Sequence, residues 1–264
     1  MELRDFEGKV VVVTGGGGGV GLALCRQFAE RGARVVGVGR TAAKLELAAE
    51  VVRGAGGEAQ IVVADITAPD AAARVIEACN AFGGVDTLIN NAAVGYSYEK
   101  LRPGSMASLA GQSPALWREV IDINLNGPAM ITQALIPKLL ERAPGASIVF
   151  ISSVMSYGGY SHAHAYAAAK AAINNLVKSL AVTHGPAGLR TNCVAPGLIE
   201  TEMAEAVFAT GLLERDESRF AFCPLGRAAT ADEVASAALF LASSSAAYIN
   251  GAVLTVDGGT SAKG

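Results

Sequence analysis

Cysteine, aromatic side chains and an excess of one charge are all scarce in this chain of 264 residues. The four cysteines form no CxxC pair and no metal-ligand cluster, which favours the reduced thiols of a cytoplasmic protein and predicts no metal site. A formal net charge of −3 provides no basic surface for nucleic acid or an anionic membrane. No uncharged apolar run reaches the roughly 20 residues that span a bilayer, and the charged residues 1–9 argue against a secretory signal.

Linkers are also missing, because the chain has no Pro/Ser tract, charge block or change of composition. We therefore expect one domain over residues 1–264. Short β-branched runs alternate with helical tracts, which predicts an α/β fold with a doubly wound sheet of parallel strands. The expected strands are 9–14, 33–39, 59–65, 86–89, 147–151, 189–194 and 253–257. Ligands of such sheets lie at the carboxyl ends of the strands.

The first expected strand runs directly into a glycine turn, Gly15 to Gly21, and a helical tract over 22–31 follows. This arrangement is typical of dinucleotide binding, because glycines let the backbone approach a pyrophosphate and the helix N-terminus offers free N–H groups. The alternative is a flexible linker. A linker would not be enclosed between a four-valine strand and an apolar helix, so we favour a cofactor site.

Arg40 follows the second expected strand, and Asp65 is the last residue of the third. At the end of the second strand, an acid binds the 2′-hydroxyl of NAD, whereas an arginine accommodates the 2′-phosphate of NADP. Here the acid is absent and Arg40 is present, which predicts a preference for NADP(H) unless Arg40 only caps a loop. Asp65 either accepts from the adenine amino group or caps the turn that follows it.

Two asparagines lie at notable places. Asn91 follows the fourth expected strand, and its side chain is expected to bind neighbouring backbone. Asn124 lies inside an expected helix over 115–142, for which Ser113 is the N-cap and Pro114 the first residue. Because a mid-helix Asn is unfavourable and a Gly-Pro pair follows, we predict a local irregularity. A buried Asn there would need partners such as water or a neighbouring lysine.

Tyr166 and Lys170 open an Ala-rich tract over 166–182 that we expect to be helical, with both side chains on one face. A neighbouring ammonium would lower the pKa of the phenol from about 10 and make Tyr166 a proton donor and acceptor near neutrality. Ser153 ends the preceding strand and could hydrogen-bond the substrate oxygen. Tyr-x-x-x-Lys alone more often marks a solvated helix face. A functional site is favoured because several candidate residues fall at strand ends: Gly15, Arg40, Asp65, Asn90 and Ser153.

Three segments break the alternation and are predicted to form the substrate pocket: loop 94–112, loop 154–164 and a flap over 202–222. In the second, His162 and His164 either bind a polar substrate group or are plain surface residues. Tyr157 and Tyr160 could add an aromatic wall.

From about residue 6 to residue 259, the chain resembles the short-chain dehydrogenase/reductase family. The matching residues stand in order and at the spacing of the family: Thr14-Gly15-x-x-x-Gly19-x-Gly21, Asp65, Asn90-Asn91-Ala92, Asn124, Ser153, Tyr166-x-x-x-Lys170 and Pro196-Gly197-x-Ile199-x-Thr201. The sequence departs from the family at Ala93, where Gly is common, and in loop 94–112, which looks longer than usual. Gly18 also stands at a position where members of the family that prefer NADP(H) often have a basic residue. The predicted preference for NADP(H) therefore rests on Arg40 alone.

The resemblance implies a Rossmann-type fold with a seven-stranded parallel sheet, assembled as a homotetramer or homodimer. It implies that Tyr166 is the acid/base, Ser153 polarises the carbonyl and Asn124 positions a water in a proton relay. Lys170 would hold the nicotinamide ribose and lower the pKa of Tyr166. The implied cofactor contacts are Gly15, Gly19 and Gly21 at the pyrophosphate, Asp65 at the adenine, Asn91 near the adenosine ribose, and Ile199 and Thr201 at the carboxamide.

We therefore expect an NADP(H)-preferring oxidoreductase, with NAD(H) as the second possible cofactor, that interconverts a secondary alcohol and a ketone of small size. One alternative is a 3-oxoacyl-thioester reductase, which would need a basic surface for an acyl carrier protein that this slightly acidic chain does not indicate. Another is a sensor that binds NADP(H) without chemistry. Such proteins typically lose the Tyr or the Lys, and both are present here.

Overall fold

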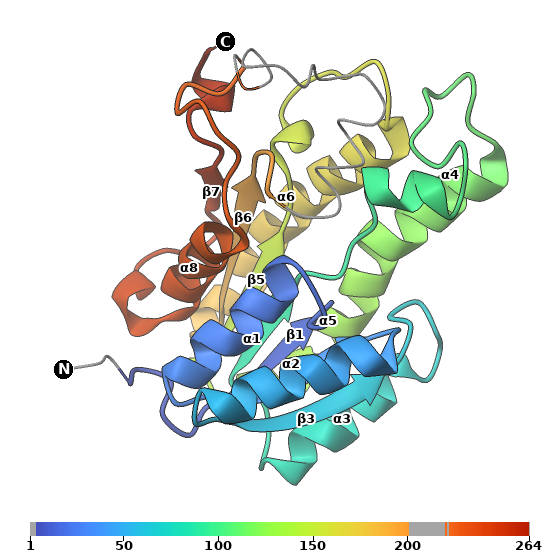
Figure 1. Ribbon diagram of the computed structural model, residues 1–264. Helices are drawn as coiled ribbons and strands as arrows, with labels where there is room; N and C mark the ends of the chain where they lie inside the picture. Colours follow the sequence, from blue (N-terminus) through green and yellow to red (C-terminus); the bar gives the residue numbers. More distant parts are fainter. Residues whose placement is uncertain (1–3, 201–219, 221, 264) are drawn as a thin grey trace.

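The computed structural model describes residues 4–200, 220 and 222–263, which contain a seven-stranded sheet with helices on both faces (Figure 1). The strand order is β3-β2-β1-β4-β5-β6-β7, and every neighbouring pair is parallel. The chain begins in the middle of the sheet, moves to one edge, and then returns to β4 and moves to the other edge. The carboxyl ends of β1 and β4 thus form the switch point where ligands bind in such sheets. The predicted Rossmann-type fold is confirmed.

The strands lie within two residues of their expected bounds: β1 (Val10–Thr14), β2 (Arg34–Gly39), β3 (Glu58–Val63), β4 (Thr87–Asn90), β5 (Ser147–Ile151), β6 (Arg190–Pro196) and β7 (Val253–Val256). The expected third strand was to close at Asp65, but β3 ends at Val63. Asp65 instead caps a turn, since its Oδ1 accepts from the backbone N and the hydroxyl of Thr67 at 2.9 and 2.7 Å.

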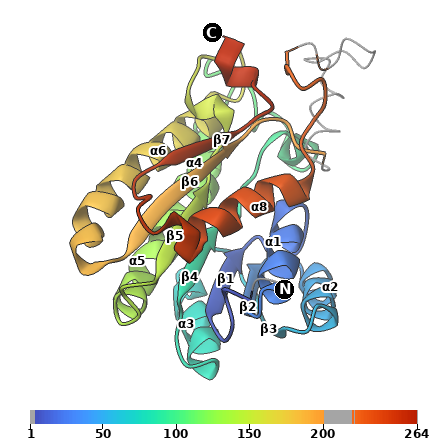
Figure 2. The ribbon, with the colours of Figure 1, turned by 90° about the vertical axis from the view of Figure 1, so that its left-hand side faces the viewer.

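The helices form two layers. Those of the described ranges are α1 (Val20–Glu30), α2 (Ala42–Gly54), α3 (Ala71–Ala81), α4 (Pro114–Ile121), α5 (Gly127–Leu140), α6 (His164–His184) and α8 (Ala231–Ala242). Figure 2 shows α1, α2 and α8 on one side of the sheet and α3, α5 and α6 on the other. No helix among residues 4–200, 220 and 222–263 combines the length and the apolar character needed to cross a membrane.

The four valines of β1 show why this strand has no polar alternation. Val11 and Val13 pack in the core under α1 and α8, whereas Val10 and Val12 pack in the core under α3, α5 and α6. None of the four is more than 2% exposed. A strand covered on both faces is a nearly continuous apolar run, and this run carries the glycine turn at its end.

The helix expected over 115–142 is interrupted by a π-helical turn, η2 (Asp122–Asn126), between α4 and α5. Buried Asn124 lies in this turn: its Oδ1 accepts from Val94 N at 3.1 Å, and its Nδ2 donates to Val120 O at 2.9 Å. The predicted irregularity is confirmed. These partners are backbone groups, not the lysine that we had considered.

Side chains cap two of the helices. The Ser113 hydroxyl accepts from Leu116 N at 3.2 Å and starts α4, as predicted. Thr230 and Glu233 form a capping box at the start of α8. Helix α6 begins at His164, two residues before the expected start, and follows Ala163, which has the left-handed φ of 55°.

Candidate active site

The glycine turn after β1 is too tight for side chains at two positions. Gly15 has a φ of 69°, and a Cβ added to it would lie 2.9 Å from Ala92 Cα. A Cβ on Gly21 would lie 1.9 Å from the Gly15 carbonyl oxygen. Gly19 precedes α1, so the free N–H groups of that helix start at this turn. Such a cradle of bare backbone fits the close approach of a pyrophosphate.

Thr14 and Asn91 brace this turn. The Thr14 hydroxyl accepts from Asn91 N and Ala92 N, both at 3.0 Å. The Asn91 side chain in turn donates to Thr14 O and Gly15 O, at 3.0 and 3.3 Å. The backbone-binding role predicted for Asn91 is therefore confirmed, and it joins the ends of β1 and β4 at the switch point.

A cavity of about 850 Å³ extends from the glycine turn to Tyr166. Seven of the predicted site residues line it: Gly15, Gly19, Asn91, Ser153, Tyr166, Lys170 and Ile199. Gly21 lies beside the turn, packed against Gly15, and Asn124 is buried in η2. Thr201 lies outside the described residues, as does most of the predicted flap over 202–222.

Tyr166, Ser153 and Lys170 are buried together where β5 meets α6, at 8%, 9% and 3% exposure. The Ser153 hydroxyl accepts from Met155 N at 3.1 Å and lies beside the Tyr166 phenol, whose pKa it acts to lower. Lys170 Nζ donates to Ile151 O at 2.8 Å and lies 5.6 Å from the centroid of the Tyr166 ring. The i, i+4 spacing on α6 thus places the phenol and the ammonium side by side, as predicted.

The charge states of this pair follow from burial. Burial raises the pKa of Tyr166 to about 12, although Ser153 acts in the opposite direction. Burial also lowers the pKa of Lys170 to about 8. The expected lowering of the Tyr166 pKa by Lys170 is not found, because loss of hydration outweighs other effects and the ammonium donates to the Ile151 carbonyl oxygen.

Arg40 and Asp65 line a second cavity of about 580 Å³ at the ends of β2 and β3. Arg40 Nη1 lies 3.9 Å from Asp65 Oδ2, and the two side chains are 52% and 40% exposed. Both residues therefore reach the switch-point edge of the sheet, as predicted. Asp65 performs the turn-capping role that we had considered, while its second oxygen faces Arg40.

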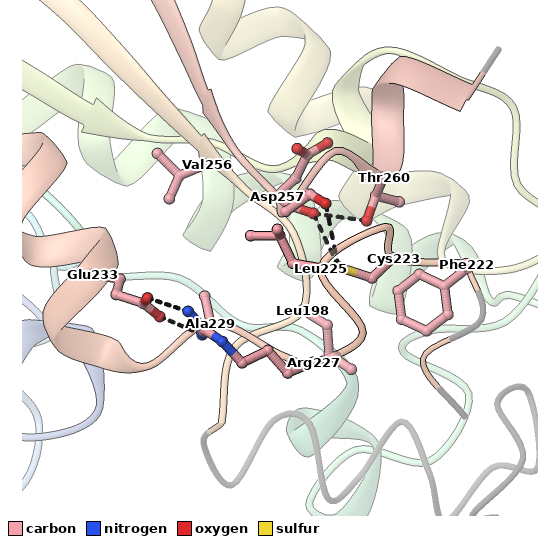
Figure 3. A pocket seen from close by; sticks show the side chains of 11 residues that line it. Leu198, Phe222, Cys223, Leu225, Arg227, Ala229, Glu233, Val256, Asp257 and Thr260 are labelled. Atoms are coloured by element: carbon pink, nitrogen blue, oxygen red, sulfur yellow. Dashed lines mark hydrogen bonds and ion pairs between the residues drawn. The ribbon is translucent and has the colours of Figure 1, made fainter. Parts of the chain in front are cut away.

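A third cavity of about 100 Å³ adjoins the large one, and Leu198, Phe222 and Thr260 line both (Figure 3). Arg227 binds Glu233 at 2.6 Å. The Cys223 sulfur hydrogen-bonds the backbone oxygens of Asp257 and Gly258, each at 3.6 Å. These contacts attach the segment 222–229 to α8 and to the end of β7. They therefore hold in place the segment from which Phe222 lines the large cavity.

Only some of the loop residues predicted to form the substrate pocket line the large cavity. Tyr160 and His162 line the large cavity. His164 does not: its Nδ1 accepts from Leu109 N at 2.9 Å and its Nε2 donates to Tyr160 O at 2.8 Å, which fixes the start of α6. The Tyr157 hydroxyl lies 3.2 Å from that of Thr255, outside the lining.

Some lining residues were not identified from the sequence. Tyr96 and Ser97, in the 3-10 turn η1 (Tyr96–Lys100), line the large cavity, and so do Met155 and Lys44. The length of loop 94–112 and its tyrosines were the available signal, but which of its side chains turn inward depends on contacts with α4. Nothing in the sequence indicated that Lys44 would line the cavity, since the tract that forms α2 shows only an amphipathic pattern.

Comparison with known proteins identifies the family. A family model described as enoyl-(acyl carrier protein) reductase matches residues 15–261. Cis-4-hydroxycyclohexanecarboxylate dehydrogenase of Sinomonas cyclohexanicum is 37% identical over 258 residues, which span 97% of this chain and 98% of that protein. The L-tagatose-forming galactitol 2-dehydrogenase of Cereibacter sphaeroides is 35% identical, over 96% of this chain and 95% of its own.

The chain belongs to the short-chain dehydrogenase/reductase family. A solved short-chain dehydrogenase/reductase from Mycobacterium marinum superposes with a TM-score of 0.87 at 27% identity, over 98% of both chains. The protein is therefore an oxidoreductase that acts on CH–OH and C=O groups with a nicotinamide cofactor. The glycine cradle and the cavity beside it have the form that such a cofactor needs.

Proposed function

We propose that this protein is an NADP(H)-preferring oxidoreductase that interconverts a secondary alcohol and a ketone, with Tyr166 as the acid/base. One observation carries the proposal: the buried Tyr166, Ser153 and Lys170 share a single cavity with the glycine turn. A sensor without chemistry would not need a phenol, a hydroxyl and an ammonium buried at that place. We also infer one domain from the absence of a linker, a cytoplasmic location from the scattered cysteines, and a homotetramer or homodimer from the family resemblance.

The nicotinamide, when bound, supplies or accepts the hydride. Ser153 hydrogen-bonds the substrate oxygen, and Tyr166 gives that oxygen its proton in the direction of reduction. In the opposite direction Tyr166 takes the proton from the alcohol. Lys170, 5.6 Å from the ring centroid, offsets the negative charge of the phenolate. Asn124 is assigned to the water relay, and its two backbone bonds hold η2 and Val94 in place for that role.

The residues that would hold the cofactor are grouped by the part that each contacts: Gly15, Gly19 and Gly21 at the pyrophosphate, Asn91 at the adenosine ribose, Asp65 at the adenine, Arg40 at the 2′-phosphate, Lys170 and Tyr166 at the nicotinamide ribose, and Ile199 and Thr201 at the carboxamide. The choice of NADP(H) depends on Arg40 and on the absence of an acid at the end of β2.

The raised pKa of Tyr166 predicts opposite pH profiles for the two directions. With a pKa of about 12, the phenol is protonated at neutral pH and ready to donate, so kcat/KM for reduction should be flat from about pH 6 to 8. Oxidation needs the phenolate, so its kcat/KM should rise about tenfold per pH unit over the same range. Initial rates in both directions would check this. An oxidation rate that levels off near pH 7 would contradict the raised pKa.

The reaction is tested by following NADPH oxidation with a panel of ketones. The panel includes cyclic ketones, diketones, keto sugars, 3-oxoacyl thioesters and 4-oxocyclohexanecarboxylate, the ketone of the substrate named for the 37% identical relative. Turnover of a simple ketone supports the proposal, and turnover restricted to the thioesters favours the acyl-carrier alternative. Tight binding of NADPH without turnover of any ketone or alcohol would favour the sensor.

A further inference from the structure

The turn η1 contributes neighbouring side chains to two different cavities. Tyr96 and Ser97 line the large cavity that holds Tyr166, whereas Tyr98 lines the second cavity that holds Arg40 and Asp65. This turn belongs to loop 94–112, the segment that looked longer than usual for the family. The part of the loop that carries Tyr98 therefore lies at the adenosine end of the proposed cofactor site.

Tyr98 is buried, at 8% exposure, and its hydroxyl donates to Glu119 Oε1 on α4. Arg40 lines the same cavity, and its guanidinium lies near enough to the phenol oxygen to act to lower the pKa of Tyr98, although burial and Glu119 raise it overall. Arg102 of the same loop binds Glu119 through Nε, at 3.1 Å. Together with Tyr98, Arg102 lowers the pKa of Glu119, so the acceptor of the Tyr98 hydroxyl is a carboxylate.

The contacts of Arg40 show what the phenol contributes. At 3.9 Å from Asp65, Arg40 is in an ion pair but beyond hydrogen-bonding distance, and its side chain is about half exposed. An exposed arginine has many rotamers, and fixing one of them on binding costs conformational entropy. The phenol, held by Glu119 and by its own burial, supplies a rigid acceptor that restricts Arg40 before a ligand arrives.

We propose that Tyr98 is a positioning residue that holds Arg40 toward the 2′-phosphate, so that loop 94–112 contributes to cofactor selectivity. This inference rests on the proposed preference for NADP(H). A purely structural role for Tyr98, which would attach the loop to α4 through Glu119, makes a different prediction: loss of the hydroxyl would then affect NADPH and NADH equally, because the loop would be disturbed as a whole.

The test is Tyr98→Phe, which keeps the packed ring and removes only the hydroxyl. Dissociation constants for NADPH and NADH would be measured by titrating the nucleotide fluorescence. We expect the Kd for NADPH to rise about fivefold, the usual effect of one lost hydrogen bond, and the Kd for NADH to stay within about twofold. The control is Tyr248→Phe, which removes the hydroxyl of a fully exposed tyrosine and should change neither constant.

A double-mutant cycle separates the remaining outcomes. In an Arg40→Ala background, Tyr98→Phe should no longer change the ratio of the two constants. Equal weakening of both cofactors, or an unchanged ratio in the single variant, would overturn the positioning role while leaving the proposed function intact. A wild-type protein that binds NADH as tightly as NADPH would contradict the proposed cofactor preference, and this inference with it.

Discussion

Tyr166→Phe is expected to lower turnover by about 10²–10⁴-fold, the usual contribution of a positioned general acid. The ring would still fill its place against α6, but no group would remain to exchange a proton with the substrate oxygen. The hydroxyl is one of many groups assigned to the cofactor, and its loss leaves the glycine turn and Lys170 in place, so the Kd for NADPH should rise by no more than about fivefold. Single-turnover rates and fluorescence titration would measure the two quantities separately.

Tyr160→Phe is the matched control for this loss. Tyr160 lines the same cavity, but its hydroxyl lies 3.4 Å from Val154 O and is not part of the group around Lys170. Its removal should change KM at most, with kcat nearly preserved. Near-normal turnover in Tyr166→Phe would exclude Tyr166 as the acid and leave Ser153 as the remaining hydroxyl of that group.

The fold could be predicted from the sequence because its signals are local. The valines of β1 indicate a strand covered on both faces, and the glycines after it indicate a turn in which Gly21 has no room for a Cβ. The i, i+4 spacing of Tyr166 and Lys170 places both on one face of any helix. Such features depend on spacing along the chain, so the sequence contains them directly.

The electrostatics of the site could not be predicted in this way. A neighbouring lysine suggested a lowered pKa for Tyr166, but burial raises it to about 12, and the extent of burial depends on how α6 packs against β6 and α4. One of the two partners of Asn124 also comes from a distant segment, since Val94 lies in loop 94–112. Long-range contacts determine both the pKa of Tyr166 and the partners of Asn124, and the sequence alone does not specify such contacts.

The position of Tyr98 also could not be predicted from the sequence. Nothing in the pattern around it distinguishes it from Tyr96, yet the two line different cavities. A 3-10 turn directs successive side chains about 120° apart, so neighbours in sequence can serve different sites. The assignment of each residue therefore required the structure.

Arg40→Asp should reverse the cofactor preference. Loss of the guanidinium removes a charge-assisted contact to the 2′-phosphate, and the new carboxylate would repel it, so we expect the Kd for NADPH to rise about 100-fold. The same carboxylate at the end of β2 can accept from the 2′-hydroxyl of NADH, whose Kd should fall or stay constant. Titration of both cofactors at a fixed ionic strength of about 0.1 M would give the ratio, because phosphate contacts are screened by salt.

Arg53→Asp is the appropriate control, because it changes the net charge equally at an exposed position in the last turn of α2. If long-range electrostatics alone governed binding, both variants would weaken NADPH to a similar degree. A large effect at Arg40 and a small one at Arg53 would indicate direct recognition of the 2′-phosphate. An unchanged NADPH/NADH ratio in Arg40→Asp would mean that Arg40 serves only as a partner of Asp65 and Tyr98, and that the selectivity of this enzyme has another source.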